Sequence, residues 1–329
     1  MRIRLVNRTI LAVLALLCCL SVGCVVFVDD TNSGRQKTVD ETVTLASPLG
    51  SRGHLTVETS FGAINVTGAD VAECQVEAVI TAKAKTQTQA QAIADQTNVR
   101  LETKAHGLRL YLEKPSLARG SSVGASFTIL VPKETTLACS TTFGTVKIDT
   151  IEGDVKADTS FSSITCRHIK GNLDLTSKHG DVRCKQVLSP DMVIKTSFGS
   201  IDIACLDLEP YQASGKVNLE TKHGGIDVLN LAARQLTARA SHGNIDIHCV
   251  PTDLPGMGAD IETSHGSIEF DTPGAFAGKV SLETSHGKVN TKLPITVQGT
   301  ASTQRLAGTI GKGDGDIRLR TSHGSITLK

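Results

Sequence analysis

The stretch LETSHGKVNT, Leu282 to Thr291, recurs almost unchanged as IETSHGSIEF from Ile261 and as LRTSHGSITL from Leu319. Upstream, the same phrase carries Phe in place of His, in VETSFGAINV from Val57 and in IKTSFGSIDI from Ile194. A phrase that recurs every 20 residues or so is typical of stacked repeat architectures. We call it the repeat phrase.

Ten copies of the repeat phrase align on the residue that follows the His or Phe, which we call the repeat Gly. Its positions are Gly62, Gly144, Ser162, Gly180, Gly199, Gly224, Gly243, Gly266, Gly287 and Gly324. Two residues later every copy has Ile or Val, and five residues earlier every copy has an apolar residue. The residues in between are mostly polar or charged. This period of two is the signature of strands with one buried face.

Successive repeat positions from Gly144 to Gly287 lie 18 to 25 residues apart. Two short strands and two turns fill such a period, so each copy predicts one coil of a β-solenoid. A meander of hairpins would produce the same alternation. The solenoid is favoured because interior positions keep the same residue type in successive copies, as stacked neighbours require. The predicted fold is all-β: a β-solenoid of about ten short coils, with one short helix near the N-terminal end.

The His-Gly or Phe-Gly pair of each copy is expected to reverse the chain. Gly reaches positive φ freely, and His is among the few other residues enriched there. The pair is therefore interpreted as a turn in left-handed conformation.

Four segments follow from the pattern: 1–28 is a signal, lipoprotein or anchor segment, and 29–53 is a tether and entry. Residues 54–132 form an N-terminal capping part with a short helix at 83–97, and 133–329 is the repeat solenoid. The helix is predicted because KAKTQTQAQAIADQT is rich in Ala and Gln and lacks a β-branched run.

The N-terminal segment indicates export. Three arginines precede an uncharged run from Ile10 to Val28. Within it, Ser21 to Cys24 (SVGC) resembles a bacterial lipobox, with Ser where Leu is usual, and this predicts lipidation of Cys24. Ordinary signal-peptidase cleavage and a retained membrane helix are the alternatives. The expected location is extracytoplasmic, anchored to the membrane of a bacterial cell envelope.

Seven histidines precede a Gly, and stacking would align four of them in one column at about the inter-strand spacing of 4.7–4.9 Å. These four are His223, His242, His265 and His286. Imidazoles at that spacing could share Zn²⁺ or Cu²⁺. The same slot holds Phe61, Phe143, Phe161 and Phe198 in other copies. Because Phe cannot bind metal, the pattern favours ring packing over a metal site.

Cys166 and Cys184 occupy the same position in adjacent coils. Their Cα separation should fall within the range that disulfides accept, and an exported protein lies in a disulfide-permissive compartment. Other copies mostly have Ile or Val there, so two buried free thiols are the alternative.

Composition argues against several classes of function. A net charge of +1 gives no electrostatic basis for binding nucleic acid, and no cofactor motif is present. Asp202, Asp227 and Asp246 form an acidic column, which polysaccharide-cleaving β-helices also have, but a solvated face produces the same pattern. The chain has no Trp with which to build an aromatic sugar-binding groove.

Two further stretches carry a resemblance to a known family: FTILVPKETTL, from Phe127 to Leu137, and the terminal stretch from Leu306 to Leu328. Together with the repeats, they resemble the bacterial "putative adhesin" repeat domain over residues 57–329. The resemblance implies an extracytoplasmic β-solenoid of unknown function. We therefore expect a non-enzymatic, membrane-tethered envelope protein that acts as an adhesin-like scaffold or binds an envelope protein or glycan. The alternative is a polysaccharide-active β-helix enzyme.

Overall fold

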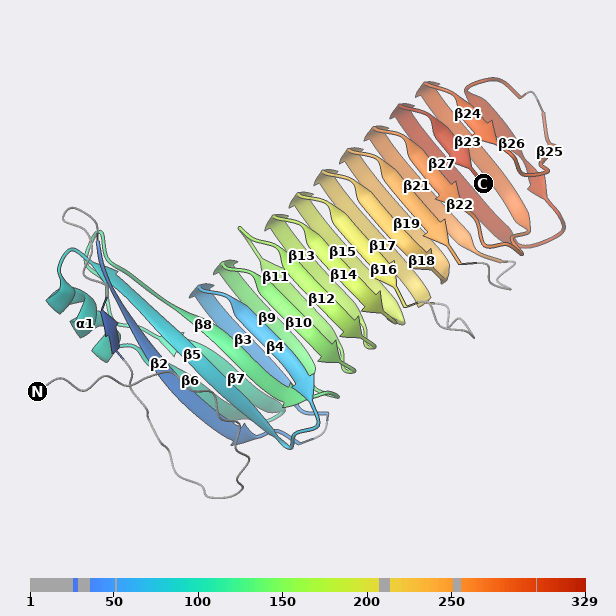
Figure 1. The fold of residues 1–329 in the computed structure, drawn as a ribbon. Helices are drawn as coiled ribbons and strands as arrows, with labels where there is room; N and C mark the ends of the chain where they lie inside the picture. The colour runs from blue at the N-terminus through green and yellow to red at the C-terminus, as the bar shows by residue number, and fades with distance from the viewer. Residues whose placement is uncertain (1–25, 29–35, 51, 207–213, 251–255, 300) are drawn as a thin grey trace, which may run out of the picture.

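The computed structural model describes residues 26–28, 36–50, 52–206, 214–250, 256–299 and 301–329. Two sheets of 14 strands each lie face to face along an elongated molecule (Figure 1). Apolar side chains from both sheets fill the space between them.

Sheet A contains the strands that follow each repeat Gly, together with part of the N-terminal cap. In spatial order its strands are β1 (Val26–Val28), β2 (Lys37–Pro48), β5 (Glu73–Ala84), β8 (Ser122–Pro132), β4 (Ile64–Ala69), β10 (Val146–Ile151), β12 (Ile164–Ile169), β14 (Val182–Val187), β16 (Ile201–Cys205), β18 (Ile226–Leu231), β20 (Ile245–Cys249), β22 (Ile268–Asp271), β28 (Ile326–Leu328) and β24 (Val289–Thr291).

Sheet B contains the strands that precede each repeat Gly. In spatial order its strands are β25 (Thr296–Val297), β26 (Arg305–Ile310), β23 (Gly278–His286), β27 (Gly315–His323), β21 (Gly258–His265), β19 (Ala233–His242), β17 (Ser214–His223), β15 (Asp191–Phe198), β13 (Leu173–His179), β11 (Val155–Thr159), β9 (Thr136–Phe143), β3 (His54–Phe61), β7 (Gly107–Glu113) and β6 (Asn98–Lys104).

Each copy of the repeat phrase forms one coil: a strand of sheet B, a corner at the repeat Gly, and a strand of sheet A. Neighbouring coils pair in parallel in both sheets, as β12 does with β10 and β14, and as β13 does with β11 and β15. A meander of hairpins would pair antiparallel. The structure therefore confirms the predicted all-β solenoid.

The order of the coils in space differs from their order in the chain. The last coil, β27–β28, lies between the coil β21–β22 and the coil β23–β24. The chain returns to this place through β26, which pairs antiparallel with β23 and covers the end of sheet B. Because an open sheet edge invites unwanted pairing, this return also protects that end. The copies are too alike for the sequence to indicate which two coils adjoin.

The predicted inward face is confirmed. The Ile or Val two residues after the repeat Gly is buried in every coil except the outermost, where Val289 is half-buried. The apolar residue five positions before the Gly is buried in all ten coils.

The Thr of the repeat phrase has a structural role that its sequence pattern did not reveal. Its hydroxyl donates to the backbone carbonyl of the repeat Gly in the neighbouring coil: Thr263 Oγ1 lies 3.0 Å from Gly243 O, and Thr321 Oγ1 lies 2.8 Å from Gly266 O. Both threonines are buried. An unpaired buried hydroxyl costs about 1–3 kcal/mol, so these hydrogen bonds explain why Thr is retained at an interior position.

All nine repeat glycines approach the neighbouring corner too closely for a Cβ, and five of them also adopt the positive φ expected of the turn: Gly62, Gly180, Gly224, Gly243 and Gly324. A Cβ on Gly266 would lie 2.0 Å from the carbonyl oxygen of Gly243, although Gly266 itself lies outside the left-handed region. The expectation of a left-handed His before the Gly is wrong. In the described part of the chain, the non-glycine residues with positive φ are Arg52, Thr150, His168, Gln186 and Asn230.

The N-terminal end is a cap in which β2, β5 and β8 pair antiparallel. The predicted helix is present but shorter than 83–97: α1 spans Gln87–Asp95 and is N-capped by Thr86, whose Oγ1 accepts from Gln89 N at 3.2 Å. Part of the segment expected to be a tether, 37–48, forms β2 instead. All 12 residues of β2 pair in register along the whole of β5.

Candidate binding face

The rings before each repeat Gly stack into one continuous ladder along the corner where sheet B meets sheet A. In spatial order the ring ladder is Phe61, Phe143, Phe161, His179, Phe198, His223, His242, His265, His323 and His286. Neighbouring centroids are 4.6 to 5.0 Å apart. Planes differ by 12° at most. The column expected from sequence is thus present, with one correction: His323 lies between His265 and His286 because its coil is inserted there.

The geometry of the ring ladder suits packing rather than metal binding. Parallel rings direct their nitrogen lone pairs within separate parallel planes, so the lone pairs of His223, His242, His265 and His286 do not converge on one point. Among the described residues, no group of three or more His, Cys, Asp or Glu side chains is placed to hold a metal ion.

The two paired cysteine positions face each other as expected. Cys166 and Cys184 are register partners on β12 and β14, both are buried, and both are free thiols in the structure. The hydrogen bond with Cys166 and burial raise the pKa of the Cys184 thiol well above its ordinary value. A high thiol pKa disfavours the thiolate, which is the reactive form.

The lipidation residue Cys24 lies outside the described residues. Within the described ranges, no helix is long and apolar enough to cross a membrane.

The outward face of sheet B carries charges that largely pair with each other. Four residues before the repeat Gly, neighbouring coils often alternate in sign: Lys195 lies 3.7 Å from Glu220. Arg239 lies 2.8 Å from Asp260 on the next strand and 4.0 Å from Glu262. Oppositely charged cross-strand pairs of this kind contribute little each, but they leave the face close to neutral.

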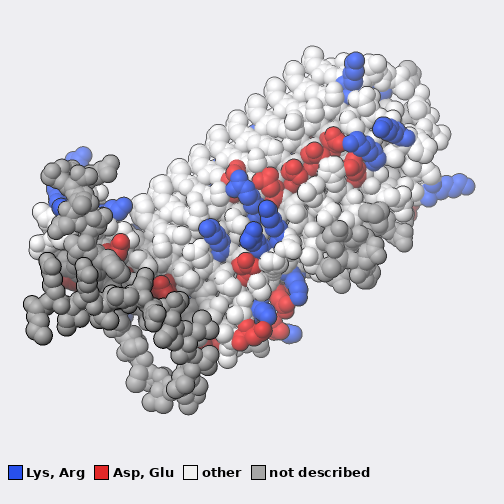
Figure 2. All heavy atoms as spheres, in the orientation of Figure 1, with Lys and Arg blue, Asp and Glu red and all other residues white. Residues whose placement is uncertain are grey.

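The outward face of sheet A separates its charges instead. Strands β10, β12 and β14 form a basic half, and β16, β18, β20 and β22 form an acidic half. In Figure 2 the Lys and Arg side chains gather near the middle of the molecule, and a row of Asp and Glu continues from them towards the C-terminal end.

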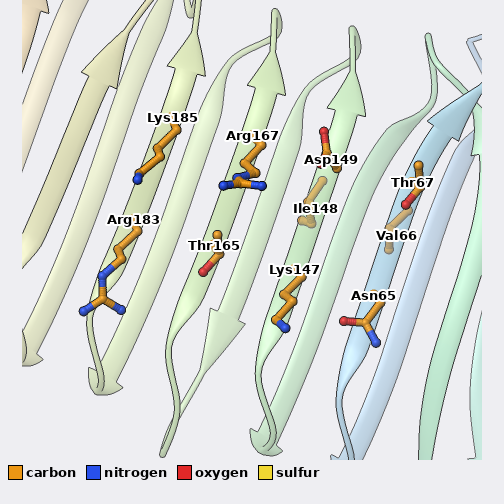
Figure 3. A pocket seen from close by; sticks show the side chains of 10 residues that line it. All are labelled: Asn65, Val66, Thr67, Lys147, Ile148, Asp149, Thr165, Arg167, Arg183 and Lys185. Carbon is orange, nitrogen blue, oxygen red and sulfur yellow. The ribbon is translucent and has the colours of Figure 1, made fainter.

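The basic half surrounds a shallow hollow with a volume of about 460 Å³ (Figure 3). Lys147, Arg167, Arg183 and Lys185 project towards it from three neighbouring strands, with Asp149 as the one carboxylate. Arg183 contacts Asp181 at 2.5 Å and Asp202 at 3.4 Å. Within the described ranges, the other three cations take part in no ion pair. The hollow is therefore a concentration of uncompensated positive charge.

The acidic half continues the same rows of side chains. Asp202, Asp227, Asp246 and Glu269 are register neighbours on four successive strands, three residues after the repeat Gly. Burial raises the pKa of the Asp202 carboxyl and of the Asp246 carboxyl, and neighbouring carboxylates, Asp227 among them, add to both shifts. Crowded like charges disfavour ionisation, so an approaching cation would be stabilised here.

His248 lies between Asp246 of this row and Asp271, its register partner on β22. Its Nδ1 donates to Asp271 Oδ2 at 2.5 Å, and its Nε2 lies 3.0 Å from Asp246 Oδ1 without the alignment of a hydrogen bond. The hydrogen bond to Asp271 raises the pKa of His248, burial opposes it, and the charges of Asp271, Asp246 and Glu269 add to the rise.

This arrangement predicts a pH-dependent contribution to stability from His248. Because its folded pKa is raised, the stabilisation is complete below the unfolded value near 6.5 and is lost as pH rises through the folded pKa. We expect His248→Gln to lower the urea midpoint at about pH 5.5 and to leave it unchanged at about pH 9. A difference from wild type that stays constant across this range would show that His248 does not act through its charge.

Sequence reasoning found part of this face and missed the rest. The acidic column Asp202, Asp227 and Asp246 was recognised. The basic half was not predicted, although the sequence contains a pattern that indicates it. The residue three positions after the repeat Gly is basic at Lys147 and Arg183 and becomes acidic from Asp202 onward. The pairs that neutralise sheet B were also not predictable, because long side chains reach across strands.

Residues 53–329 match the family model described as Toastrack DUF4097, which covers most of the chain. The chain belongs to this family. The expected membership in a repeat-domain family of unknown function is thereby confirmed. The curated proteins include no match.

Several solved structures are similar to this Toastrack chain at low identity. A "putative adhesin" from Bacteroides fragilis is 14% identical, with a TM-score of 0.41, covering 88% of this chain and 97% of its own. A "putative adhesin" from Parabacteroides merdae is 10% identical, with a TM-score of 0.42 and coverage of 88% and 96%. A "putative lipid binding protein" from Parabacteroides distasonis is 12% identical, with a TM-score of 0.36 and coverage of 88% and 96%.

Proposed function

We propose that this chain is a non-enzymatic, membrane-tethered cell-envelope protein that uses the outward face of sheet A to bind another envelope component. The observation that carries the proposal is the contrast between the two outward faces. Along the row four residues before the repeat Gly, sheet B pairs neighbouring charges of opposite sign. On sheet A, Lys147, Arg167 and Lys185 take part in no ion pair among the described residues and lie beside a row of crowded acids. Separated charge on a rigid face serves recognition, because it steers and orients a complementary partner.

The stacked core supports a scaffold role. Apolar side chains from two sheets fill the solenoid along its length, and each coil pairs with its neighbours through backbone hydrogen bonds. Side chains three and five residues after each repeat Gly are therefore held in straight rows, which suits a preformed binding surface.

The alternative, a polysaccharide-active enzyme, has weaker support. The acids of sheet A stand in a row on an open face, and the hollow lies over the basic half rather than over them. Lys147 and Arg167, the candidate bases, are on strands β10 and β12, away from Asp227 and Asp246. A catalytic pair needs an acid and a base within hydrogen-bond reach of one substrate.

Tethering is proposed to depend on Cys24, from the lipobox-like stretch Ser21 to Cys24. We expect the wild-type chain to fractionate with membranes and to incorporate labelled fatty acid. Cys24→Ala should lose the label. If this variant stays in the membrane at an unshortened length, the apolar run that begins at Ile10 and precedes β1 is retained as the anchor, and the lipid anchor is wrong.

Photocrosslinking in the intact envelope tests whether the partner contacts sheet A. A photoreactive side chain on the outward face of sheet A should capture the partner, and one on sheet B in the same coil should not.

A further inference from the structure

We propose that the partner of the sheet A face is the same face of a second copy of this chain, in antiparallel orientation. The proposal rests on the proposed function for its choice of face and adds the identity of the partner. It comes from the two halves of the face, which are opposite in charge and nearly equal in length. The basic half spans three strands and the acidic half spans four.

The symmetry of such a pair follows from the fold. A two-fold axis parallel to the strands, between the two faces and level with the boundary of β14 and β16, reverses the direction of the solenoid. It keeps each residue's position along its strand. Strand β14 of one copy then faces β16 of the other, β12 faces β18, and β10 faces β20. A two-fold pair of this kind uses one surface twice, as most homodimers do.

This operation brings opposite charges together. In the row three residues after the repeat Gly, Arg183 faces Asp202 of the second copy and Lys147 faces its Asp246. In the row five residues after the Gly, Asp149 faces His248 of the second copy, the one base of the acidic half. Every pair occurs twice by symmetry. The boundary itself already shows the contact chemistry within one chain, since Arg183 lies 3.4 Å from Asp202.

The centre of the face adds an apolar contact. Leu229 on β18 is 45% exposed, an unusual side chain for an outward position in the acidic half. The same symmetry places it opposite Arg167 on β12, whose hydrocarbon stem can cover it while the guanidinium stays in water. An exposed Leu thus meets an Arg that takes part in no ion pair among the described residues.

The size of the face indicates a weak pair. Six facing strands at about 4.8 Å each, over about five residues at 3.3 Å, give a footprint near 500 Å² on each copy. The total of about 1,000 Å² is at the low end of specific interfaces. Such an interface is expected to be reversible and sensitive to salt, because exposed charge pairs are screened.

The orientation has a consequence for tethered chains. The cap with β2 lies at one end of the molecule and the last coils lie at the other (Figure 1). In the antiparallel pair the two caps are at opposite ends. Copies anchored through their N-terminal segments would therefore link two membrane surfaces, which is the geometry that homophilic adhesion requires.

The test is the self-association of the full chain by sedimentation equilibrium in density-matched detergent, at low and high salt. We expect wild-type dimers that weaken with salt. Lys147→Glu and Asp246→Lys each create two like-charge contacts, and each should raise the dissociation constant about tenfold or more. Combining both changes in one chain, or mixing the two variants, restores opposite charges and should restore the wild-type affinity.

Lys195→Glu on sheet B is the matched control and should leave the dissociation constant unchanged. A chain that is monomeric at all salt concentrations, or variants that are not rescued by mixing, would overturn the pairing. Retention of polyglutamate by the monomeric chain, lost in Lys147→Glu but not in Asp246→Lys, would instead show that the basic half is a polyanion site. A monomer that still captures a different envelope component through sheet A would overturn this inference and leave the proposed function intact.

Discussion

Ile268→Asp is expected to unfold much of the C-terminal half of the solenoid, whereas Ser267→Asp is expected to be nearly silent. Ile268 is 1% exposed and is the register partner of Ile245 on one side and Ile326 on the other. A carboxylate there would be buried without a charge partner, which costs about 3–5 kcal/mol. Ser267 is exposed at the adjacent position and points the opposite way.

Because the two residues are neighbours in the chain, a difference in stability between the two variants reflects which side chain points inward and not where in the chain it lies. Thermal and urea unfolding of the two variants measure it directly. Melting temperatures that fall by the same amount would show that the side-chain alternation, and with it the register of the coils, is wrong.

The second large loss of stability is expected for Gly266→Ala, which adds only one methyl group at the corner. The added methyl group would lie 2.0 Å from the carbonyl oxygen of Gly243, a backbone atom that cannot move away without shifting the neighbouring coil. Because Gly266 is not in the left-handed region, the cost comes from the close approach alone. We expect a loss of about 2–3 kcal/mol, as for other overpacked sites.

Gly256→Ala is the matched control, since a Cβ there meets nothing within 4 Å. It should be neutral or slightly stabilising, because Ala reduces the entropy of the unfolded chain. If both alanine variants unfold at the wild-type urea concentration, the corners are not packed as closely as the structure has them.

The sequence was sufficient to predict the fold because the repeat phrase combines two independent signals. The period of two defines which side chains are inside, and the recurrence of the same residue types defines stacking. Phe198, His223 and their counterparts could be aligned in one ladder for the same reason. Nothing in the phrase distinguishes one neighbour from another, so the insertion of the coil with His323 between those of His265 and His286 could not be predicted.

The corners were predicted only in part, because the sequence does not show distances. His before Gly suggested a left-handed turn, but each ring instead lies at the end of a sheet B strand and stacks on its neighbours. The residues that do adopt positive φ include Thr150, Gln186 and Asn230, six positions after the repeat Gly. The buried Ile151, Val187 and Leu231 follow them directly, so these left-handed residues help to turn the next side chain inward.

The candidate site was predictable only in part for a similar reason. An acidic column can be counted in a sequence once the coils are aligned. Whether its charges are neutralised depends on which long side chains reach across strands. Arg239 reaches Asp260 on sheet B, whereas Lys147 on sheet A takes part in no ion pair in the described part of the chain. The distinction between a solvated face and a binding face is therefore a property of the folded chain.

The central claim, that sheet A is the binding face, is tested most directly by photocrosslinking in the intact envelope. A photoreactive residue replaces Leu229 on sheet A or Glu220 on sheet B, which lie in the same coil and are both exposed. We expect crosslinked adducts from position 229, with a second copy of the chain as the captured partner, and none from position 220. Adducts that form from position 220 and not from position 229 would contradict it.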